Sequence, residues 1–363
     1  SKLSLKVNYI YNFISQILTL IIPMVTTPYI ARVLRENGNG QYSFSFSIIT
    51  YFILFANLGF NTYGQREISK YRNDPMKRTK VLAEISIVRS ITTFIAILIL
   101  FIALFFGIFG EKYTLIIVAL SIQLIAVPFD INFYYQGLEN FRAIAIRSII
   151  LKIMGLIGVF LFVKTENDTW IYALCLSISV MLSNLVLWPS VLKDCTKITF
   201  RDVELKKHIK PAIVIFLPAL AVTIYSVLDK TMIGFLAVSP DYENGCYEQA
   251  YKLNSIALLL ITVISPIFSS RNSYEHAMGN EDKLKNNIYL ASNYVWLIGL
   301  PLTAFFLVLS PNLCSWFLGG GFYEVPLLLR IMSVRFLLSG FSEIFGNQLF
   351  VSIGREKYTT IAT

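Results

Sequence analysis

Charged residues and histidines are scarce in this sequence. Only 15% of the 363 residues are charged and two are histidine, whereas 55% are hydrophobic and the mean hydropathy is +0.63. A water-soluble fold of this length needs a far more polar surface, so the composition excludes one. The sequence instead indicates an integral membrane protein.

Motifs for metal binding and hydrolytic chemistry are also missing. The four cysteines have no C-x-x-C spacing, and G-x-x-x-x-G-K-[ST], H-E-x-x-H and G-x-S-x-G are absent. The sequence therefore predicts no metal site, no bound cofactor and no enzymatic activity. Cys246 and Cys314 both lie near the expected outer face and could pair, but isolated small residues in membrane helices are the favoured interpretation.

Long apolar runs recur from end to end, and short polar segments separate them. Each run is long enough for a helix that crosses about 30 Å of hydrocarbon. We expect an all-α polytopic membrane protein with ten to eleven spans. Ten of these runs are residues 8–32, 41–63, 81–109, 114–137, 143–163, 170–192, 210–237, 247–270, 287–310 and 325–352.

The basic residues are distributed unevenly along the chain. If the N-terminus is cytoplasmic, the inner segments hold 21 Lys and Arg, and the outer segments hold only Arg32, Arg35, Lys112 and Lys164. This is the positive-inside pattern, which predicts a cytoplasmic N-terminus. The net charge of +9 then reflects topology and contact with anionic membrane lipids, and not binding of nucleic acid.

The chain contains an internal repeat. "NGQYSFSF" at 39–46 matches "NGCYEQAY" at 244–251 with an offset of 205 residues, and "FYYQGLENFRAIA" at 133–145 matches "FVSIGREKYTTIA" at 350–362. We expect an N-terminal six-helix bundle at 1–205 and an incomplete second bundle at 206–363, with the natural protein continuing for at least two more helices. Six spans per repeat is an even number, so the two halves should be parallel and face each other across a cleft, a layout that suits a transporter.

Ionisable residues inside the expected spans are candidates for a transport pathway. A charge in the bilayer core is costly, so such residues usually face a bundle interior or an aqueous cavity. In the first half, Arg89, Asp130 and Lys152 lie at similar depth and are expected to meet. Asp130 either neutralises one of the bases or takes a functional role.

The second half carries a further group. Asp229 and Lys230 are adjacent, so on a helix they point about 100° apart and cannot pair with each other. We expect Lys252 to pair with Asp229, which leaves Lys230 facing the cleft.

The tenth expected span carries the remaining charges. Arg335 should line the cavity, and Glu343 is its partner or a titratable coupling group. Arg330 lies near the end of the span, so it either snorkels to the interface or lines the cavity. The excess of bases over acids within the spans predicts selection for anions.

Four segments in order carry a resemblance to a known family. These are "PYIARVLRENGNGQYSFSFSI", "NLGFNTYGQREIS", "FYYQGLENFR" and "VLDKTMIGFL". With them, the chain resembles the Wzx-type polysaccharide repeat-unit flippases of the multidrug/oligosaccharidyl-lipid/polysaccharide (MOP) exporter superfamily, whose fold is MATE-like. Members of this family usually have twelve or more spans.

The resemblance implies movement of a polyprenyl-diphosphate-linked oligosaccharide across the bacterial plasma membrane, with polysaccharide polymerases and glycosyltransferases as pathway partners. The diphosphate would meet the basic residues, with Arg32 as an outer-gate contact and the rest within the spans: Arg89, Lys152, Lys230, Lys252 and Arg335. Na⁺ and H⁺ are both open as the coupling ion. Two alternatives are a cation-coupled multidrug exporter of the same superfamily and a membrane-embedded polysaccharide polymerase or ligase.

Overall fold

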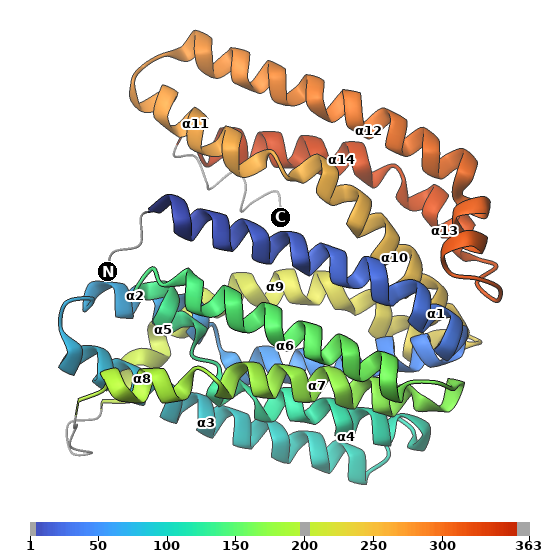
Figure 1. The fold of residues 1–363 in the computed structure, drawn as a ribbon, viewed down its shortest axis with the longest axis horizontal. Coiled ribbons are helices and arrows are strands. Elements are labelled where there is room, and N and C mark those ends of the chain that lie inside the picture. Colours follow the sequence, from blue (N-terminus) through green and yellow to red (C-terminus); the bar gives the residue numbers. More distant parts are fainter. Residues whose placement is uncertain (1–4, 197–203, 354–363) are drawn as a thin grey trace. The chain divides into compact units, whose positions relative to one another are not determined.

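The computed structural model describes residues 5–196 and 204–353, and within these ranges the chain forms helices joined by turns. Figure 1 shows their arrangement. The helices of residues 5–196 are α1 (Leu5–Asn57), α2 (Phe60–Lys70), α3 (Pro75–Phe105), α4 (Glu111–Ile125), η1 (Val127–Phe129), α5 (Asn132–Gly137), α6 (Phe141–Phe162), η2 (Glu166–Asp168), α7 (Thr169–Leu185) and α8 (Trp188–Asp194). Those of residues 204–353 are α9 (Lys206–Leu236), α10 (Pro240–Thr262), α11 (Ser265–Ala277), α12 (Glu281–Phe317), α13 (Val325–Met332), α14 (Arg335–Glu343) and the π-helix η4 (Ile344–Phe350).

The predicted all-α multi-pass architecture is confirmed. Among the described residues, eight segments are long and apolar enough to cross a membrane. One of them, Ile22–Lys70, covers the last part of the first expected span and all of the second, with non-helical backbone between them at Arg35 (φ 53°, ψ −167°). The expected span at 247–270 falls on α10 and α11, and it is not among the eight. The number of spans therefore stays a prediction.

The chain divides into two compact units, Ser1–Gly245 and Cys246–Thr363. The division at 245/246 is based on contacts between residues, whereas the expected boundary at 205/206 is based on the sequence repeat. The first unit includes α9, which packs against α1 and α2, and α10 continues from the first unit into the second. The extent of the repeat stays a prediction.

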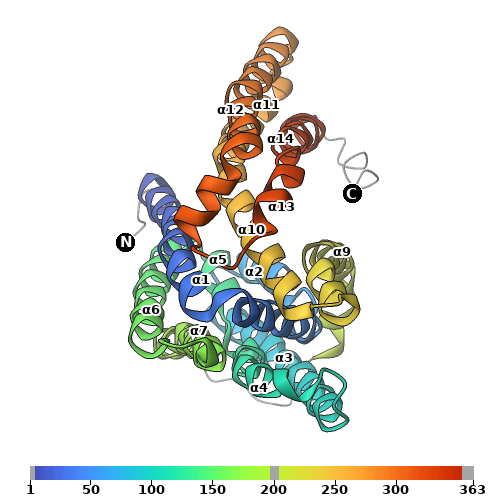
Figure 2. The ribbon, with the colours of Figure 1, turned by 90° about the vertical axis from the view of Figure 1, so that its right-hand side faces the viewer.

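In the first unit, α1 lies at the centre and packs against α3, α4, α6, α7 and α9. Figure 2 shows these helices close to end-on. The part of α1 before the bend contacts α6, where Tyr29 Oη donates to the carbonyl of Val163 at 2.7 Å. The part after the bend carries Phe44, whose ring packs against Tyr113 of α4 and Phe235 of α9.

Glycines allow the close approach of helices in the first unit. A side chain at Gly234 of α9 would collide with the ring of Phe44. At Gly40 it would collide with the backbone carbonyl of Asp241, and at Gly245 with the backbone carbonyl of Glu36. The last two contacts are reciprocal and related by the 205-residue offset of the sequence repeat. The beginning of α10 therefore crosses the bend of α1 at glycine contacts that no larger residue would permit.

In the second unit, the long helix α12 packs against α11, α13 and α14. Its buried face presents Val295 and Phe306, and the ring of Phe306 lies 5.1 Å from that of Phe336 on α14. Gly340 allows this packing, because a Cβ there would lie 2.6 Å from Val295 Cγ1. This arrangement fixes the position of Arg335, the first residue of α14.

Candidate substrate-binding region

The fourth expected span is not a continuous helix. α4 ends at Ile125, a turn of 3₁₀-helix containing Pro128 follows, and α5 begins only at Asn132. Between them Asp130 has extended backbone (φ −73°, ψ 101°). Proline lacks a backbone N–H and disrupts the helical hydrogen bonds around it, so the interruption follows from Pro128. Depth estimates from the sequence assumed an unbroken helix here, and that assumption was wrong.

The interruption leaves backbone carbonyls short of the usual helical hydrogen bonds, although that of Ala126 still accepts one from the Phe129 N–H at 3.2 Å. Three side chains from other helices donate to them: Asn184 Nδ2 to Ala126 at 3.0 Å, Trp188 Nε1 to Phe129 at 2.9 Å, and Arg89 Nη1 to Asp130 at 2.5 Å. At membrane depth there is little water to serve as a substitute partner. These donors therefore hold the interruption in place.

Arg89 of α3 lies at the centre of this region. Its side chain is 1% exposed, Nη2 lies 3.8 Å from Asp130 Oδ2, and the guanidinium stands 5.8 Å from the centre of the Phe133 ring. Asn61 Nδ2 donates to the same carboxylate oxygen at 3.4 Å. The structure thus brings together Arg89 and Asp130, whereas Lys152, the third member of the predicted group, has an exposed side chain on α6.

Arg147 of α6 is a second buried guanidinium here, and the sequence analysis did not name it as a candidate. It is 7% exposed, and its Nη2 donates to Asn132 Oδ1 at 2.8 Å. The backbone N–H of Asn132 in turn donates to Asp130 Oδ1 at 3.0 Å. Within the described parts of the chain, Nε and Nη1 of Arg147 and Nε of Arg89 have no hydrogen-bond partner. Two guanidiniums therefore lie around one carboxylate, Asp130, with donor atoms to spare.

One sequence signal could have found Arg147. The residue lies within the apolar run expected at 143–163, four residues after its start, on a face that the structure buries. Pro128 in the fourth expected span was a comparable signal for the interruption. Only the packing of α3, α5 and α6 shows that the two features belong to one site.

Lys230 and Asp229 occupy different environments on α9. Lys230 is 8% exposed and Asp229 is exposed, as expected for neighbours that point in different directions on a helix. The backbone carbonyl of Lys230 accepts a hydrogen bond from Asn244 Nδ2 at 2.7 Å. This contact ties the end of α9 to α10, and whether Asp229 meets Lys252 stays a prediction.

In the second unit, Lys252 and Arg335 each contact a residue of α10. Lys252 Nζ lies 3.1 Å from Glu248 Oε1 on the same helix, an acid that the sequence analysis did not consider. The Arg335 guanidinium lies 5.3 Å from the centre of the Tyr251 ring. Because Glu248 neutralises Lys252, the excess of positive charge in this unit is smaller than the count of bases suggested.

The tenth expected span is also irregular, just before Arg335. Between α13 and α14, the N–H groups of Ser333 and Phe336 bond three residues back, to Arg330 and Ser333. Asn254 Nδ2 donates to the carbonyl of Met332 at 3.0 Å and Thr303 Oγ1 to that of Ser333 at 3.3 Å. Glu343, predicted as a partner of Arg335 or a coupling group, accepts a hydrogen bond from Ser265 Oγ at 2.8 Å.

Two arginines lie at the bend of α1: Arg32, which was predicted as a site residue, and Arg35. Arg32, the expected outer-gate contact, is exposed three residues before Arg35. Arg35 Nε lies 2.9 Å from Glu166 Oε1, so the bend is joined to η2 by an exposed ion pair. A gating role for Arg32 stays a prediction.

A buried polar cluster joins the beginning of α9 to α2 and α3. Glu84 is fully buried, its Oε2 lies 2.7 Å from His208 Nε2, and His208 Nδ1 lies 2.8 Å from Tyr63 Oη. Lys207 Nζ and the backbone N–H of Glu204 also contact the Glu84 carboxylate, at 3.1 and 2.8 Å. A carboxylate with this many partners anchors a helix end, and the sequence analysis did not name His208 as a candidate.

No group of three or more His, Cys, Asp or Glu side chains among the described residues is placed to hold a metal ion. Cys246 and Cys314 are both buried, and no disulfide joins them.

The comparisons with known proteins give this arrangement a family. A family model described as "Polysaccharide biosynthesis protein" matches residues 5–272. The chain belongs to the polysaccharide biosynthesis protein family. Two curated relatives share the name "Putative O-antigen transporter". The one from Shigella dysenteriae is 26% identical over 97% of this chain and 88% of its own length, and the one from Escherichia coli (strain K12) is 22% identical over 98% and 86%.

A solved structure shows the fold of this polysaccharide biosynthesis protein. An inward-facing multidrug resistance MATE family transporter of the MOP superfamily superposes with a TM-score of 0.66 at 15% identity, covering 94% of this chain and 86% of that one. The resemblance to MOP exporters, and the MATE-like fold that it implied, are confirmed. The family, the names of the relatives and the fold all agree with the expected polysaccharide-related transporter of the MOP superfamily.

Proposed function

We propose that this protein is a flippase for polyprenyl-diphosphate-linked oligosaccharide repeat units. It moves them by alternating access from the cytoplasmic to the outer leaflet of the bacterial plasma membrane during surface polysaccharide biosynthesis. The names of the two relatives support a cargo of polysaccharide precursors. The MATE transporter of the comparison is named for its inward-facing conformation, one of the two end states that alternating access requires.

The observation that carries the proposal is the interrupted fourth span with its two buried guanidiniums. Interrupted membrane helices commonly form substrate sites, because their freed backbone groups and nearby charges can bind a ligand. Arg89 and Arg147 against the single carboxylate of Asp130 leave a surplus positive charge and unpaired N–H groups. The surplus charge gives this region a positive potential that attracts an anionic diphosphate, while the more exposed bases make the direct contacts.

The six predicted substrate-binding bases divide into two roles. We assign direct contact with the diphosphate to those whose side chains are at least partly exposed: Lys152, Lys252, Arg335 and Arg32. Arg89 and Lys230 are buried, so we assign them to positioning, with Asp130, Asp229 and Glu343 as the structural or coupling charges. The N-terminus is cytoplasmic in this proposal, in line with the distribution of basic residues.

The test is transport by the full chain reconstituted in liposomes. The cargo is a fluorescent polyprenyl-diphosphate oligosaccharide, and the readout is the fraction that a membrane-impermeant quencher reaches. We expect the protein to move the labelled sugar between leaflets and Arg335→Ala to lose about tenfold or more in rate, as for a lost charged contact of about 1.5–3 kcal/mol.

Two controls make the result decisive. Arg66 on α2 is exposed, and Arg66→Ala should transport like the wild type. Efflux of a cationic dye is measured in parallel, because the multidrug exporter is the alternative in the same superfamily. Movement of the dye without movement of the glycolipid would reject the flippase.

A further inference from the structure

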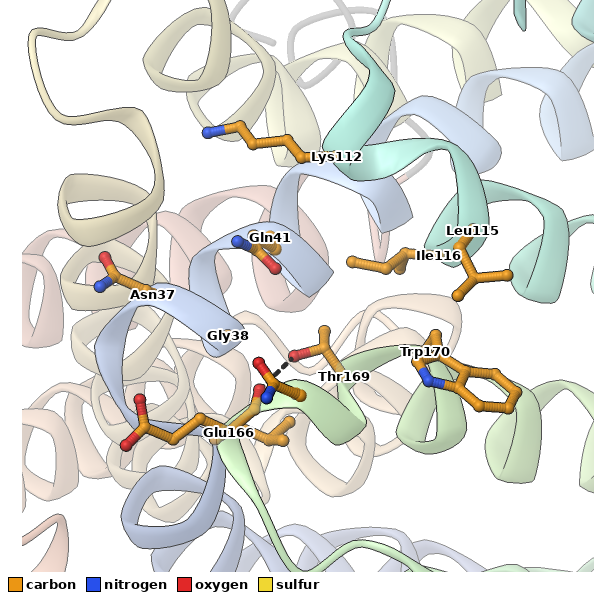
Figure 3. A pocket seen from close by; sticks show the side chains of 11 residues that line it. Asn37, Gly38, Gln41, Lys112, Leu115, Ile116, Glu166, Thr169 and Trp170 are labelled. Carbon is orange, nitrogen blue, oxygen red and sulfur yellow. Dashed lines mark hydrogen bonds between the residues drawn. The ribbon is translucent and has the colours of Figure 1, made fainter.

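A pocket of about 260 Å³ lies at one end of the first unit, where the α1 bend meets α4 and α7. The distribution of basic residues predicts that this end faces the outer leaflet. The pocket is lined by residues 34–41 of α1, 112–116 of α4 and 166–170 of η2 and α7 (Figure 3). Its volume is below the ~300–1,000 Å³ of pockets for drug-sized ligands, which suits a single ring.

The pocket has one polar and one apolar side. Figure 3 shows Asn37, Gln41 and Glu166 on one side, and Leu115, Ile116 and Trp170 on the other. The amides of Asn37 and of the neighbouring Asn167 are exposed, and among the described residues neither has a hydrogen-bond partner. Trp170 is 37% exposed. Free amides opposite an aromatic and aliphatic wall fit a ligand with hydroxyl groups on its edge and C–H groups on its face.

The charges around the pocket are balanced. Lys112 Nζ lies 2.9 Å from Asp241 Oδ2, and Glu166 Oε1 lies 2.9 Å from Arg35 Nε. No surplus positive charge is therefore available here for a phosphate, in contrast to the region around Arg147. A neutral polar ligand is the better match.

The pocket is organised in advance by close helix contacts. Gly38 forms part of its wall, and a Cβ at this position would lie 2.8 Å from Thr169 Oγ1. The Asp241 carboxylate holds Gln41 Nε2 at 3.0 Å and Tyr113 Oη at 2.5 Å. A ligand would therefore enter a formed site and would not have to order it, which favours binding.

We propose that this pocket is a saccharide subsite that binds one neutral sugar ring of the transported glycan, with the ring face against Trp170 and its hydroxyl groups on Asn37 and Asn167. The inference rests on the proposed function, because it takes the sugar from the lipid-linked cargo. It separates two tasks in the first unit, with sugar binding at this pocket and charge recognition around Arg147.

The experiment is saturation-transfer NMR on the full chain in lauryldimethylamine oxide, a detergent without a sugar headgroup. The probes are the methyl glycosides of glucose, galactose and N-acetylglucosamine. We expect transfer to the ring protons of at least one glycoside, and about fivefold weaker binding by Trp170→Ala, as for the loss of an aromatic face. The matched control is Trp296→Ala, because Trp296 is 46% exposed on α12 in the other unit.

A second variant guards against misfolding. Asn37→Ala/Asn167→Ala removes two exposed amides without partners, so its thermal unfolding should match the wild type while transfer falls. No transfer from the wild type to any of the three glycosides, or equal transfer from wild type and both variants, would overturn the subsite. Transport of the lipid-linked cargo alongside such a result leaves the flippase intact. Glycoside binding that Trp170→Ala abolishes, without transport, supports the subsite and rejects the flippase.

Discussion

The fourth and tenth expected spans, which the predicted repeat pairs, both have backbone carbonyls that accept hydrogen bonds from side chains, but the charges around them differ. In the first unit, carbonyls at the interruption accept hydrogen bonds from the side chains of Arg89, Asn184 and Trp188. In the second, the carbonyls before α14 accept them from Asn254 and Thr303. Both regions use side chains of neighbouring helices, because backbone groups at membrane depth need partners within the protein.

The difference lies in the arginine. Arg89 is 1% exposed and donates to the backbone of the interruption itself, whereas Arg335 is half-buried and rests against the Tyr251 ring. A guanidinium that holds backbone in place cannot leave it for a ligand without breaking the site. A guanidinium that only packs against an aromatic ring can bind an anion without breaking hydrogen bonds that hold the backbone. The comparison therefore supports the proposed assignment of Arg89 to positioning and of Arg335 to substrate contact.

The largest expected effect on stability comes from Arg89→Ala. The change removes one partner of a buried pair and leaves the carbonyl and carboxylate of Asp130 short of a donor. We expect the free energy of unfolding to fall by about 3 kcal/mol. Thermal unfolding of the detergent-purified protein measures this, with Arg66→Ala as the exposed-arginine control. A midpoint equal to that of the wild type would contradict the positioning role.

The next prediction tests whether an asparagine side chain that donates to a backbone carbonyl stabilises both spans. Asn184→Ala and Asn254→Ala each leave one helix carbonyl, of Ala126 and Met332, without its side-chain donor. Each change should cost about 1–3 kcal/mol of unfolding free energy. Asn73→Ala, at an exposed turn position, is the control in the same assay. Destabilisation of only one of the two asparagine variants would contradict the claim that both spans depend on such a hydrogen bond.

Arg335→Ala should have a smaller effect on stability and a large one on transport. Loss of the contact with Tyr251 is expected to cost about 0.5–1 kcal/mol. The flipping rate should nevertheless fall, because the proposed diphosphate contact is lost, and Arg335→Lys should keep part of the rate by keeping the charge. The comparison would break if the Arg335 and Arg89 alanine variants lost equal amounts of stability.

The smallest effect lies at the exit of the fourth span, outside the membrane-spanning segments. The hydrogen bond and the charge of Arg72 lower the pKa of Glu139 below its ordinary value of 4.5. The stability from this pair is therefore present above that value and is lost as the pH falls through the lowered pKa. Unfolding midpoints of wild type and Glu139→Gln should differ slightly at neutral pH and converge in acid. A gap that stays constant with pH would contradict this.

The buried residues of the candidate site show how far sequence reasoning reached. Arg89 and Asp130 were expected to meet because both lie at similar depth in apolar runs, and the structure places them together. Arg147 and Glu248 were missed, since a count of charges assigns a residue to a loop or span without showing which face of the helix it occupies. Lys152 was expected in the same group, but the face of α6 on which it lies is exposed.

The sequence by itself determined the membrane class, the helical fold and the family, because hydropathy and ordered motifs are local properties that need no knowledge of packing. Tertiary structure alone decided which carbonyls around Pro128 are free, which side chains donate to them, and that Gly40 and Gly245 contact Asp241 and Glu36. Those facts depend on helices far apart in sequence coming within hydrogen-bonding distance, and a one-dimensional pattern does not contain that distance.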